Sequence, residues 1–342
     1  MKIWLPYIVG GSGVDVFTKL LARGLRERGL EVVAQGIPHG FQYAPMILRA
    51  LRAPQGTDII IGNSWNAFAF RRSGARLFVI EHHCIFDEAY TPYRSNAQAI
   101  FHDTLVRRFE RASFNHGDTV IAVSQYTANA TAKCFPGVKP RVILNGIDTA
   151  FFCPAEKPER NDDQPFRLLF VGNWTERKGA DLIAPIMRAL GPGFELRYTS
   201  GLRTKDSEAV VQNMQATGHL TNQQLRQAYQ EADALLFPTR LEGFGYAAAE
   251  AMACGTPVIT TNCSALPELV QHNETGILCS LDDVRAFAEA ARTLKNSPQR
   301  LEAQGKAARQ RAITNLSLAR MTDQYIEALQ RTIANPSSEE AA

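Results

Sequence analysis

Short apolar runs alternate with amphipathic helical stretches along most of the chain. Strands that are covered on both faces are apolar throughout, so this alternation predicts parallel β-sheets with helices on either side. The same series begins again after residue 165, which predicts two similar α/β units. The strands expected in the first unit are KIWLPYIV, LEVVAQ, TDIIIGN, ARLFVIE, DTVIAVS and RVILN, and those in the second are FRLLFVGN, FELRYTS, DALLFP and TPVITT.

A polar segment that contains prolines, residues 155–165, separates the two sets of strands. We therefore expect an N-terminal domain at 1–155 and a C-terminal domain at 156–315. Ligands bind at the carboxyl ends of parallel strands, so two such domains are expected to face each other across a deep cleft. A last helix at about 316–334 has an apolar face and is expected to pack back on the first domain. The tail after it is expected to be disordered.

The composition is that of a globular protein and excludes several classes. The 342 residues are 45% hydrophobic and 21% charged, which disfavours disordered and fibrous chains. The net charge of +3 is far below that of a dedicated nucleic-acid binder, although residues 1–155 hold 17 basic and 11 acidic side chains. No apolar run approaches the roughly 18–20 residues of a membrane-spanning helix. The six cysteines form no CxxC pair, so no zinc knuckle or disulfide framework is predicted, and a cytoplasmic protein is expected.

The segment 240–277 carries the strongest chemical signal. A glycine turn joins the strand DALLFP to a helix that begins at about Tyr246. A helix start presents backbone N–H groups and a positive dipole end, so this turn is predicted to bind a phosphate. Glu242 before the turn and Glu250 in the helix are carboxylates that can accept hydrogen bonds from sugar hydroxyl groups. Taken alone, Glu242 could also be a solvated loop acid, and Glu250 could stabilise its own helix N-terminus.

Five motifs in a fixed order resemble one family of enzymes. They are the GGSG loop at 10–13 with the helix LARGLRERG, AVSQYTAN at 122–129, VILNGIDTAFFCP at 142–154, VGNWTERKGADLI at 171–183, and EGFGYAAAEAMACGTPVI with its LPELV and ETGIL continuation. This combination resembles the retaining glycosyltransferases of the GT-B fold, family 4 or group 1, over about residues 3–334. The resemblance implies two Rossmann-like α/β domains and transfer of a sugar from a nucleoside diphosphate sugar to an acceptor.

The resemblance also implies a role for several residues of the second domain. Glu242 faces the donor sugar, and Glu250 binds the ribose of the nucleotide. Lys178 takes the place of the lysine that neutralises the diphosphate, where a fixed cation stabilises the charge that develops on the leaving phosphate. The family usually has an arginine after the glycine of this strand, but this chain has Asn173. Asn173 brings no charge, so either Lys178 acts alone or the neighbouring Arg177 substitutes.

In the first domain, His82 matches a family histidine that follows a strand and contacts the donor sugar or its leaving group. His83 is adjacent, and side chains alternate along an extended chain, so only one of the two can face a cleft; we select His82. A strand-end histidine taken alone is more often structural. The catalytic set that the resemblance implies is His82, Glu242 and Lys178. The set expected to bind the nucleotide and its diphosphate is Gly11, Gly13, Asn173, Lys178, His219, Leu220, Phe244, Gly245, Tyr246 and Glu250.

The acceptor is expected on the first domain, where arginines and aromatic residues interleave. This combination suits a saccharide or lipid-linked acceptor of polysaccharide or lipopolysaccharide assembly, or peripheral contact with an anionic membrane. Ordinary solvated helix faces would produce the same composition. The arginines are Arg49, Arg52, Arg71, Arg72, Arg76, Arg94, Arg107, Arg108 and Arg111.

The resemblance implies retention at the anomeric carbon by front-face displacement, because no carboxylate in the motifs is an evident covalent nucleophile. No D-x-D motif occurs, and neither a metal nor another cofactor is expected. Two other interpretations stay open: a catalytically silent glycan-binding or assembly subunit of the same fold, and an isomerase or phosphorylase of related fold. A nucleotide-binding dehydrogenase is disfavoured, because GGSGVDV lacks the third glycine of the dinucleotide fingerprint.

Overall fold

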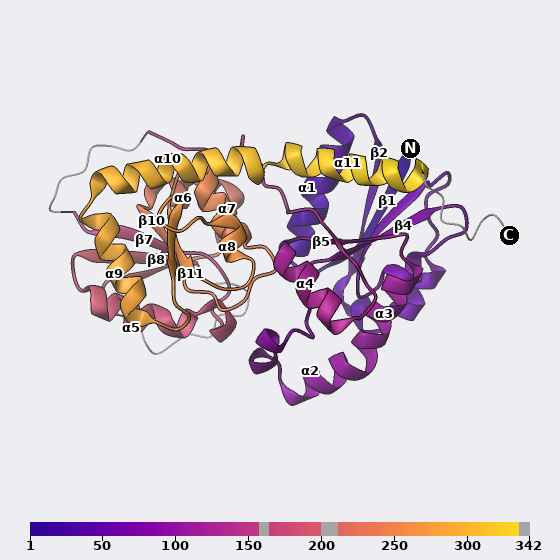
Figure 1. Cartoon of the computed structure of the whole chain (residues 1–342), viewed down its shortest axis with the longest axis horizontal. Coiled ribbons are helices and arrows are strands. Elements are labelled where there is room, and N and C mark those ends of the chain that lie inside the picture. The colour runs from indigo at the N-terminus through magenta and orange to yellow at the C-terminus, as the bar shows by residue number, and fades with distance from the viewer. Residues whose placement is uncertain (157–163, 200–210, 335–342) are drawn as a thin grey trace. The chain divides into compact units, whose positions relative to one another are not determined.

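The computed structural model describes three stretches of the chain, residues 1–156, 164–199 and 211–334. Most of the predicted linker at 155–165 and the predicted tail lie outside these stretches. The described residues form two six-stranded parallel sheets, each with helices packed on it (Figure 1). The predicted α/β fold class with two parallel-sheet units is confirmed.

Unit 1 comprises Met1–Gly146 and the chain from Leu318 onward. Its sheet has the strand order β2-β1-β3-β4-β5-β6, and all neighbours are parallel. The strands are β1 (Lys2–Val9), β2 (Glu31–Pro38), β3 (Ile59–Asn63), β4 (Arg76–Glu81), β5 (Thr119–Ala122) and β6 (Arg141–Val142). The helices are α1 (Gly13–Glu27), α2 (Asn96–Phe101), α3 (Arg107–His116), α4 (Gln125–Cys134) and α11 (Leu318–Ala334), and the short 3-10 or π turns are η1 (His39–Tyr43), η2 (Pro45–Ala50), η3 (Ala67–Phe70), η4 (Glu88–Tyr93) and η5 (His102–Val106).

Unit 2 comprises Ile147–Ser317, and its sheet has the order β12-β11-β10-β7-β8-β9 with all neighbours parallel. The strands are β7 (Phe166–Phe170), β8 (Phe194–Thr199), β9 (Met214–Gly218), β10 (Ala234–Phe237), β11 (Val258–Thr261) and β12 (Gly276–Cys279). The helices are α5 (Ala180–Leu190), α6 (Asn222–Glu231), α7 (Tyr246–Ala253), α8 (Leu266–Leu269), α9 (Val284–Lys295) and α10 (Pro298–Asn315), and η6 (Glu176–Lys178) is a 3-10 turn.

The central strands are apolar throughout because both faces of each sheet are covered. Ile59, Ile60 and Ile61 are consecutive in β3 and all buried, as are Leu235 and Leu236 in β10. Each fully buried side chain of this size contributes about 1.5–3 kcal/mol relative to exposure. Packing on both faces is therefore the physical reason why these strands appear in the sequence as unbroken apolar runs.

The boundary between the units lies between Gly146 and Ile147. Residues 147–155, which the sequence analysis placed in the first domain, bond to side chains of unit 2. Gln230 donates to the Cys153 carbonyl at 2.7 Å, and Arg309 donates to the Phe152 carbonyl at 2.8 Å. These hydrogen bonds satisfy carbonyl groups outside any strand, so the connecting segment belongs to unit 2.

Helix α11 lies against α1 in unit 1 (Figure 1). The two helices approach most closely at Gly24, where a Cβ atom would lie 2.1 Å from the hydroxyl oxygen of Thr322. The inward face of α11 consists of apolar residues at helical spacing, and Met321, Tyr325 and Leu329 are fully buried there. Helix α11 therefore completes the core of unit 1.

Candidate functional site

Lys178 and Glu242 form an ion pair at the carboxyl edge of the unit 2 sheet. Lys178 lies in η6, after β7, and Glu242 follows β10. These two strands are neighbours at the point where the strand order reverses, which is where open parallel sheets bind ligands. Nζ of Lys178 lies 2.5 Å from Oε1 of Glu242, and the two side chains are 17% and 10% exposed. The fold thus brings together Lys178 and Glu242, two of the three residues to which the family resemblance assigns a catalytic role.

Hydrogen bonds to backbone carbonyl groups hold the loop after β7 against the loop after β10. The Arg177 carbonyl accepts from the Arg240 backbone N–H at 2.9 Å and lies 3.2 Å from the Thr239 hydroxyl oxygen. In return, the Arg177 guanidinium donates to the Leu241 carbonyl at 2.7 Å. In this structure Arg177 therefore supports the loop, and its guanidinium would have to leave that carbonyl to replace the missing family arginine.

Arg240 strengthens the same junction, although the sequence analysis did not select it. Its guanidinium lies 2.7 Å from both carboxylate oxygens of Asp181, at the start of α5, and 2.6 Å from Oδ1 of Asp282. It also donates to the Glu176 carbonyl. The hydrogen bonds to Asp181 and Asp282 raise the pKa of Arg240. Arg240 therefore positions η6, and with it Lys178.

Each member of the Lys178–Glu242 pair favours the charged form of the other. Burial lowers the pKa of Lys178, and the carboxylate of Glu242 opposes that shift. Burial would raise the pKa of Glu242, but the charges of Lys178 and Arg177 outweigh burial and lower it. The Thr239 hydroxyl also donates to Glu242 at 3.0 Å. The result is a fixed cation and a fixed carboxylate in a largely enclosed place, where charges stabilise a reacting phosphate most strongly.

Gly179 allows the two loops to approach each other. Its φ is +72°, and a Cβ atom there would lie 2.0 Å from the Pro238 carbonyl oxygen. We expect Gly179→Ala to lower the free energy of unfolding by roughly 3 kcal/mol, because the methyl group must push the loops apart. Urea unfolding measures this loss. Gly29→Ala is the control, because Gly29 has φ +79° and no neighbour within 4 Å, and equal losses in the two variants would contradict the expectation.

The predicted glycine turn lies at the start of α7. Gly245 is the N-cap residue with φ +103°, and within the described residues no side chain caps the helix. Phe244 is buried, with its ring 5.2 Å from that of Tyr246. The Glu242 N–H donates to the Ser264 hydroxyl at 3.0 Å. The aromatic rings and Ser264 thus fix the turn, and its contribution to anion binding would come from the backbone at the helix start.

Glu250 faces α6 from the second turn of α7. Its carboxyl accepts from the Tyr229 hydroxyl at 3.0 Å. Burial raises the pKa of Glu250 to about 7, and the hydrogen bond from Tyr229 opposes this only in part. Such a carboxyl retains acceptor capacity for a sugar diol. Tyr229 was not predicted, because a tyrosine on the buried side of an amphipathic helix has the sequence pattern of an ordinary core residue.

The other donor-binding candidates of unit 2 lie at the same edge of the sheet. Asn173 follows β7 and is exposed, and its carbonyl accepts from the Thr175 N–H at 2.9 Å. His219 is exposed and Leu220 is half-buried, and both follow β9 directly before the N-cap of α6. Since β7 and β9 belong to one parallel sheet, all three residues lie at the edge that carries Lys178.

In unit 1, His82 follows β4 at the carboxyl edge of its own sheet. Its ring packs edge-on against Phe17 with centroids 4.7 Å apart, and Nε2 lies 3.0 Å from the side-chain oxygen of Asn63. That contact assigns the ring proton to Nε2 and leaves Nδ1 as an acceptor. Burial lowers the pKa of His82 to about 3, so the imidazole is neutral at physiological pH. The ring of His83 instead lies against Tyr90, with centroids 5.2 Å apart.

Two buried carboxyl groups lie close to each other near the end of β4. Glu81 precedes His82 and accepts from the His83 N–H at 3.0 Å, and Glu110 of α3 accepts from the Ser64 hydroxyl at 3.3 Å. Burial raises the pKa of Glu81 to about 7. Burial and the charge of Glu81 raise the pKa of Glu110 well above its usual range. Burial therefore favours the neutral form of both carboxyl groups.

An aspartate holds the glycine loop between β1 and α1. The Asp15 carboxylate accepts from the Gly11 N–H at 2.8 Å and from the Gly10 N–H at 3.2 Å. The Asp15 carboxylate thus already accepts from these N–H groups, and a diphosphate could bind the Gly11 N–H only after Asp15 released it. Gly13 begins α1 after the N-cap residue Ser12. The spacing from Ser12 to Asp15, typical of a helix start, is the signal that could have identified Asp15.

Known families match both units of the chain. Residues 165–297 match the family described as Glycosyl transferases group 1, and residues 33–151 match the one described as Glycosyltransferase Family 4. The chain belongs to the GT-B glycosyltransferases of family 4, or group 1. The family predicted from the five motifs is confirmed.

Curated relatives of this chain include a glycogen synthase and an alpha-maltose-1-phosphate synthase. A glycogen synthase from Mycobacterium tuberculosis is 34% identical over 206 residues, which cover 57% of this chain and 49% of that protein. An alpha-maltose-1-phosphate synthase from Mycolicibacterium smegmatis is 26% identical over 379 aligned positions, covering 96% of this chain and 97% of that protein. The chain thus spans about half the length of the first relative in its alignment and nearly all of the second.

Solved structures share the fold over the whole chain. A sucrose-phosphate synthase from Thermosynechococcus elongatus has a TM-score of 0.81 at 20% identity, with 97% of this chain and 100% of that chain covered. The Anabaena protein HepE, in complex with UDP and glucose, has a TM-score of 0.75 at 16% identity, with 96% and 99% covered. At these identities the likeness shows the GT-B fold.

A membrane-spanning helix and a metal-binding cluster are both absent from the described residues. Among the described residues, no helix has the length and apolar character needed to cross a bilayer. The same part of the chain contains no group of three or more histidine, cysteine or acidic side chains that could hold a metal ion.

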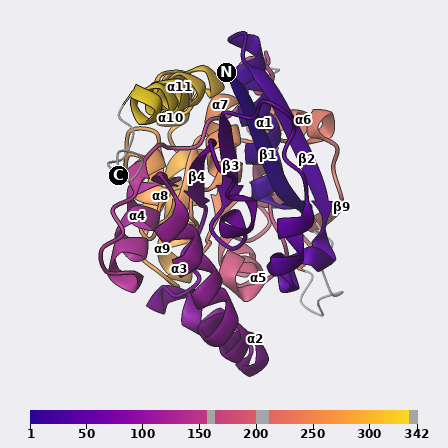
Figure 2. The same cartoon turned by 90° about the vertical axis from the view of Figure 1, so that its right-hand side faces the viewer.

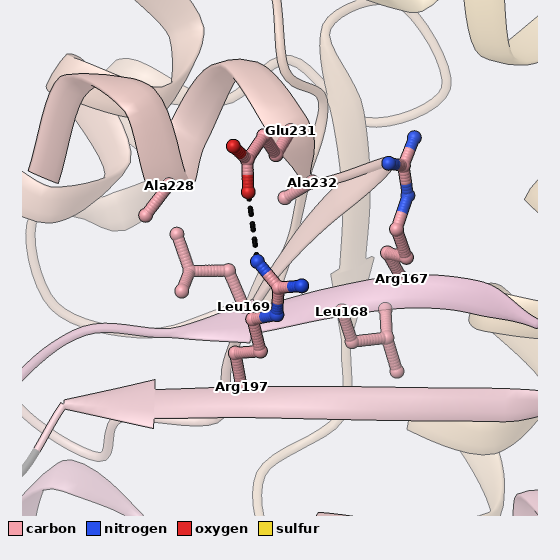
Figure 3. A pocket seen from close by; sticks show the side chains of 7 residues that line it. All are labelled: Arg167, Leu168, Leu169, Arg197, Ala228, Glu231 and Ala232. Atoms are coloured by element: carbon pink, nitrogen blue, oxygen red, sulfur yellow. Dashed lines mark hydrogen bonds and ion pairs between the residues drawn. The ribbon is translucent and has the colours of Figure 1, made fainter. Parts of the chain in front are cut away.

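A small hollow in unit 2 is separate from the residues above. It lies between α6 and strands β7 and β8, and two of the residues that line it, Arg197 and Glu231, form an ion pair of 2.7 Å (Figure 3). About 10 Å³ of space holds at most one water molecule. The hollow is therefore too small for any part of a nucleotide sugar.

The arginines expected to meet the acceptor fall into two groups. Arg71 and Arg76 bond to Asp118, Arg72 to backbone carbonyls and Arg94 to Asp103, while Arg107 lies over the Phe86 ring. The second group has exposed side chains and consists of Arg49, Arg52, Arg108 and Arg111. The structure thus reduces nine candidates to four whose guanidinium groups are open to an external anion.

Proposed function

We propose that this protein transfers a sugar from a nucleoside diphosphate sugar to an acceptor hydroxyl group with retention of the anomeric configuration. The Lys178–Glu242 pair at the reversal point of the unit 2 sheet carries the proposal. A cation and a carboxylate fixed there suit a donor that has a diphosphate on one side and a sugar on the other. Family membership supports the reaction class, and HepE, which has the same fold, is known in complex with UDP and glucose.

The geometry suggests how the donor would be bound. The diphosphate competes with Glu242 for Lys178 and receives further hydrogen bonds from the backbone at Gly245 and Tyr246. Glu242, once it shares Lys178 with the phosphate, is free to accept from a sugar hydroxyl. Glu250 gives up the hydrogen bond that it accepts from Tyr229 and accepts from the ribose hydroxyl groups instead. In this proposal Lys178 and the helix end neutralise the leaving group, and no metal or other cofactor takes part.

His82 is proposed to contact the donor sugar as a neutral group. Its Nε2–H is held by Asn63, so the Nδ1 atom is the one that can accept from a sugar hydroxyl. With a pKa of about 3 it would be a poor proton donor near pH 7. The acceptor proton is therefore proposed to go to the leaving phosphate. The backbone of His219 and Leu220 is proposed to meet the edge of the base, and unit 1 to bind a saccharide or lipid-linked acceptor.

Thermal unfolding with UDP, GDP, ADP and dTDP tests the proposal. A nucleotide at 100 times its dissociation constant adds about 2.7 kcal/mol to stability, so the correct one is expected to raise the melting temperature. Glu250→Ala is expected to abolish that response. NMR of the product formed from the matching sugar donor then reads the anomeric configuration. Absence of any nucleotide response in the wild type would contradict donor binding, and an inverted product would contradict retention alone.

A further inference from the structure

Unit 1 exposes an apolar surface that sugar transfer does not explain. Eleven large hydrophobic side chains are exposed among the described residues, and five of them belong to two segments of this unit. Their exposed fractions run from 41% to 67%. Exposed apolar side chains that gather in this way mark interaction sites, whereas scattered ones are ordinary. The five are Tyr43 of η1, Met46 and Ile47 of η2, Ile100 of α2 and Leu105 of η5.

Ring contacts show that the two segments adjoin each other. The Tyr43 ring lies 5.8 Å from that of Phe101 in α2. The Arg49 guanidinium of η2 lies 5.7 Å from the Phe68 ring, which stacks on Phe109 of α3 at 5.6 Å. The turns η1 and η2 therefore border the helical run α2–η5–α3 at two points. Figure 2 shows α2 extending away from the sheet of unit 1.

The helical run from 96 to 116 has an unusual outer stripe. His102, Val106 and Glu110 are buried at intervals of four and define its inner face. Exposed side chains on the other side recur at intervals of three to five. A surface helix normally carries polar groups on its outer face, but this stripe combines aliphatic with cationic side chains. Its aliphatic and cationic members are Ile100, Leu105, Arg108 and Arg111, and the exposed Thr104 lies among them.

The exposed charges of these two segments that form no ion pair are all positive. Residues 39–57 contain no aspartate or glutamate, and Arg49 and Arg52 are exposed there. Within the described residues neither these two arginines nor Arg108 and Arg111 form an ion pair. The exposed acid of the helical run, Asp103, is bound by Arg94 at 3.1 Å. The other acid of the run, Glu110, is fully buried and so presents no charge at this surface.

We propose that this apolar and basic patch docks on an anionic phospholipid surface. The patch consists of the five hydrophobic residues above together with Arg49, Arg52, Arg108 and Arg111. Aliphatic and aromatic side chains insert at the acyl boundary while arginines meet the phosphate headgroups. A second copy of the chain fits less well, because apposed patches would bring like charges together. The inference rests on the proposed function for its purpose, since it would hold the enzyme where a lipid-linked acceptor is found.

Vesicle flotation tests the docking. The wild type is expected to float with phosphatidylcholine vesicles that contain phosphatidylglycerol, and to lose roughly tenfold or more of that binding when salt shortens the screening length. The double variant Ile47→Glu/Ile100→Glu is expected to lose binding to a similar degree. The matched control Ile313→Glu/Ile333→Glu changes two other exposed isoleucines, 41% and 47% exposed on α10 and α11, and is expected to bind like the wild type.

Several outcomes would overturn the docking surface. These are equal binding of wild type to neutral vesicles, undiminished binding of Ile47→Glu/Ile100→Glu, or equal loss in the control. A wild-type dimer that this variant dissociates, with no vesicle binding, would assign the patch to a second copy instead. The thermal response to nucleotide is measured on the same samples. If that response persists without vesicle binding, only the docking fails, whereas vesicle binding without any nucleotide response contradicts the proposed function and leaves the docking intact.

Discussion

Lys178→Met and Glu242→Gln are each expected to lower the free energy of unfolding by about 3 kcal/mol. Each substitution leaves one largely buried charge without its partner, which is more damaging than removing both. The double variant has neither charge and is expected to recover most of the loss. Urea unfolding of the wild type, the two single variants and the double variant measures the coupling between the two side chains.

Transfer activity is expected to behave differently from stability in the same four proteins. If Lys178 and Glu242 act on the donor, each single variant loses roughly 100-fold or more in turnover, and the double variant stays as inactive although its stability returns. Arg285→Met/Glu289→Gln is the control, because this ion pair of 2.8 Å is 86% and 56% exposed. It should change stability by less than about 0.5 kcal/mol and leave turnover unchanged. Recovery of activity together with stability in the double variant would contradict a chemical role.

Glu250→Gln is expected to stabilise the protein above pH 7 and to have no such effect at acid pH. The folded protein holds the Glu250 proton up to a pKa of about 7, whereas the unfolded chain releases it near 4.5. Below pH 4.5 both states are protonated, so the group contributes nothing. As pH rises from 4.5 to 7 the folded state progressively loses stability, and above 7 the loss is complete. The amide side chain of the variant does not ionise, so the variant avoids this loss. The loss is at most about 3 kcal/mol, and nearer 2 because the side chain is not fully enclosed.

Nucleotide affinity is expected to change in the opposite direction in Glu250→Gln. A carboxylate accepts hydrogen bonds from ribose hydroxyls more strongly than an amide does, so the variant is expected to bind the nucleoside diphosphate roughly 10- to 100-fold more weakly. In the wild type, affinity should rise with pH through about 7 as Glu250 ionises. Calorimetric titration between pH 5.5 and 8.5 measures both effects. Unchanged affinity in Glu250→Gln would exclude Glu250 from the ribose site.

Most of the fold could be predicted, because buried parallel strands have a local signature. The strands β3, β4, β7 and β10 each contain three or four consecutive apolar residues, and each was expected within a few residues of its bounds. Strands β9 and β12 were not expected. In β9, Gln215 and Ala216 are exposed at the edge of the sheet, and β12 has only four residues, so neither shows a continuous apolar run. Their pairing with β8 and β11 places them in the sheet.

The candidate site could be predicted only in part. Lys178, Glu242 and Glu250 stand in motifs that are short and contiguous, and the order of those motifs identified the family. Asp15 and Tyr229 were not predicted. Asp15 matters through its hydrogen bond from the Gly11 N–H and Tyr229 through its hydrogen bond to Glu250, and no motif specifies these contacts. Arg240 was missed for the same reason, since its carboxylate partners lie 42 and 59 positions away.

The amino-acid sequence established the α/β fold, the family, and the strand ends at which charged residues stand. These depend on patterns within a few consecutive residues and on the order of motifs. The tertiary structure decided which group each charge faces and in which protonation state. Lys178 meets Glu242 across 64 positions, Glu250 is held near a pKa of 7 beside Tyr229, and burial keeps His82 neutral. Burial and long-range contacts set these properties, because the free energy of a charge depends on everything packed around it.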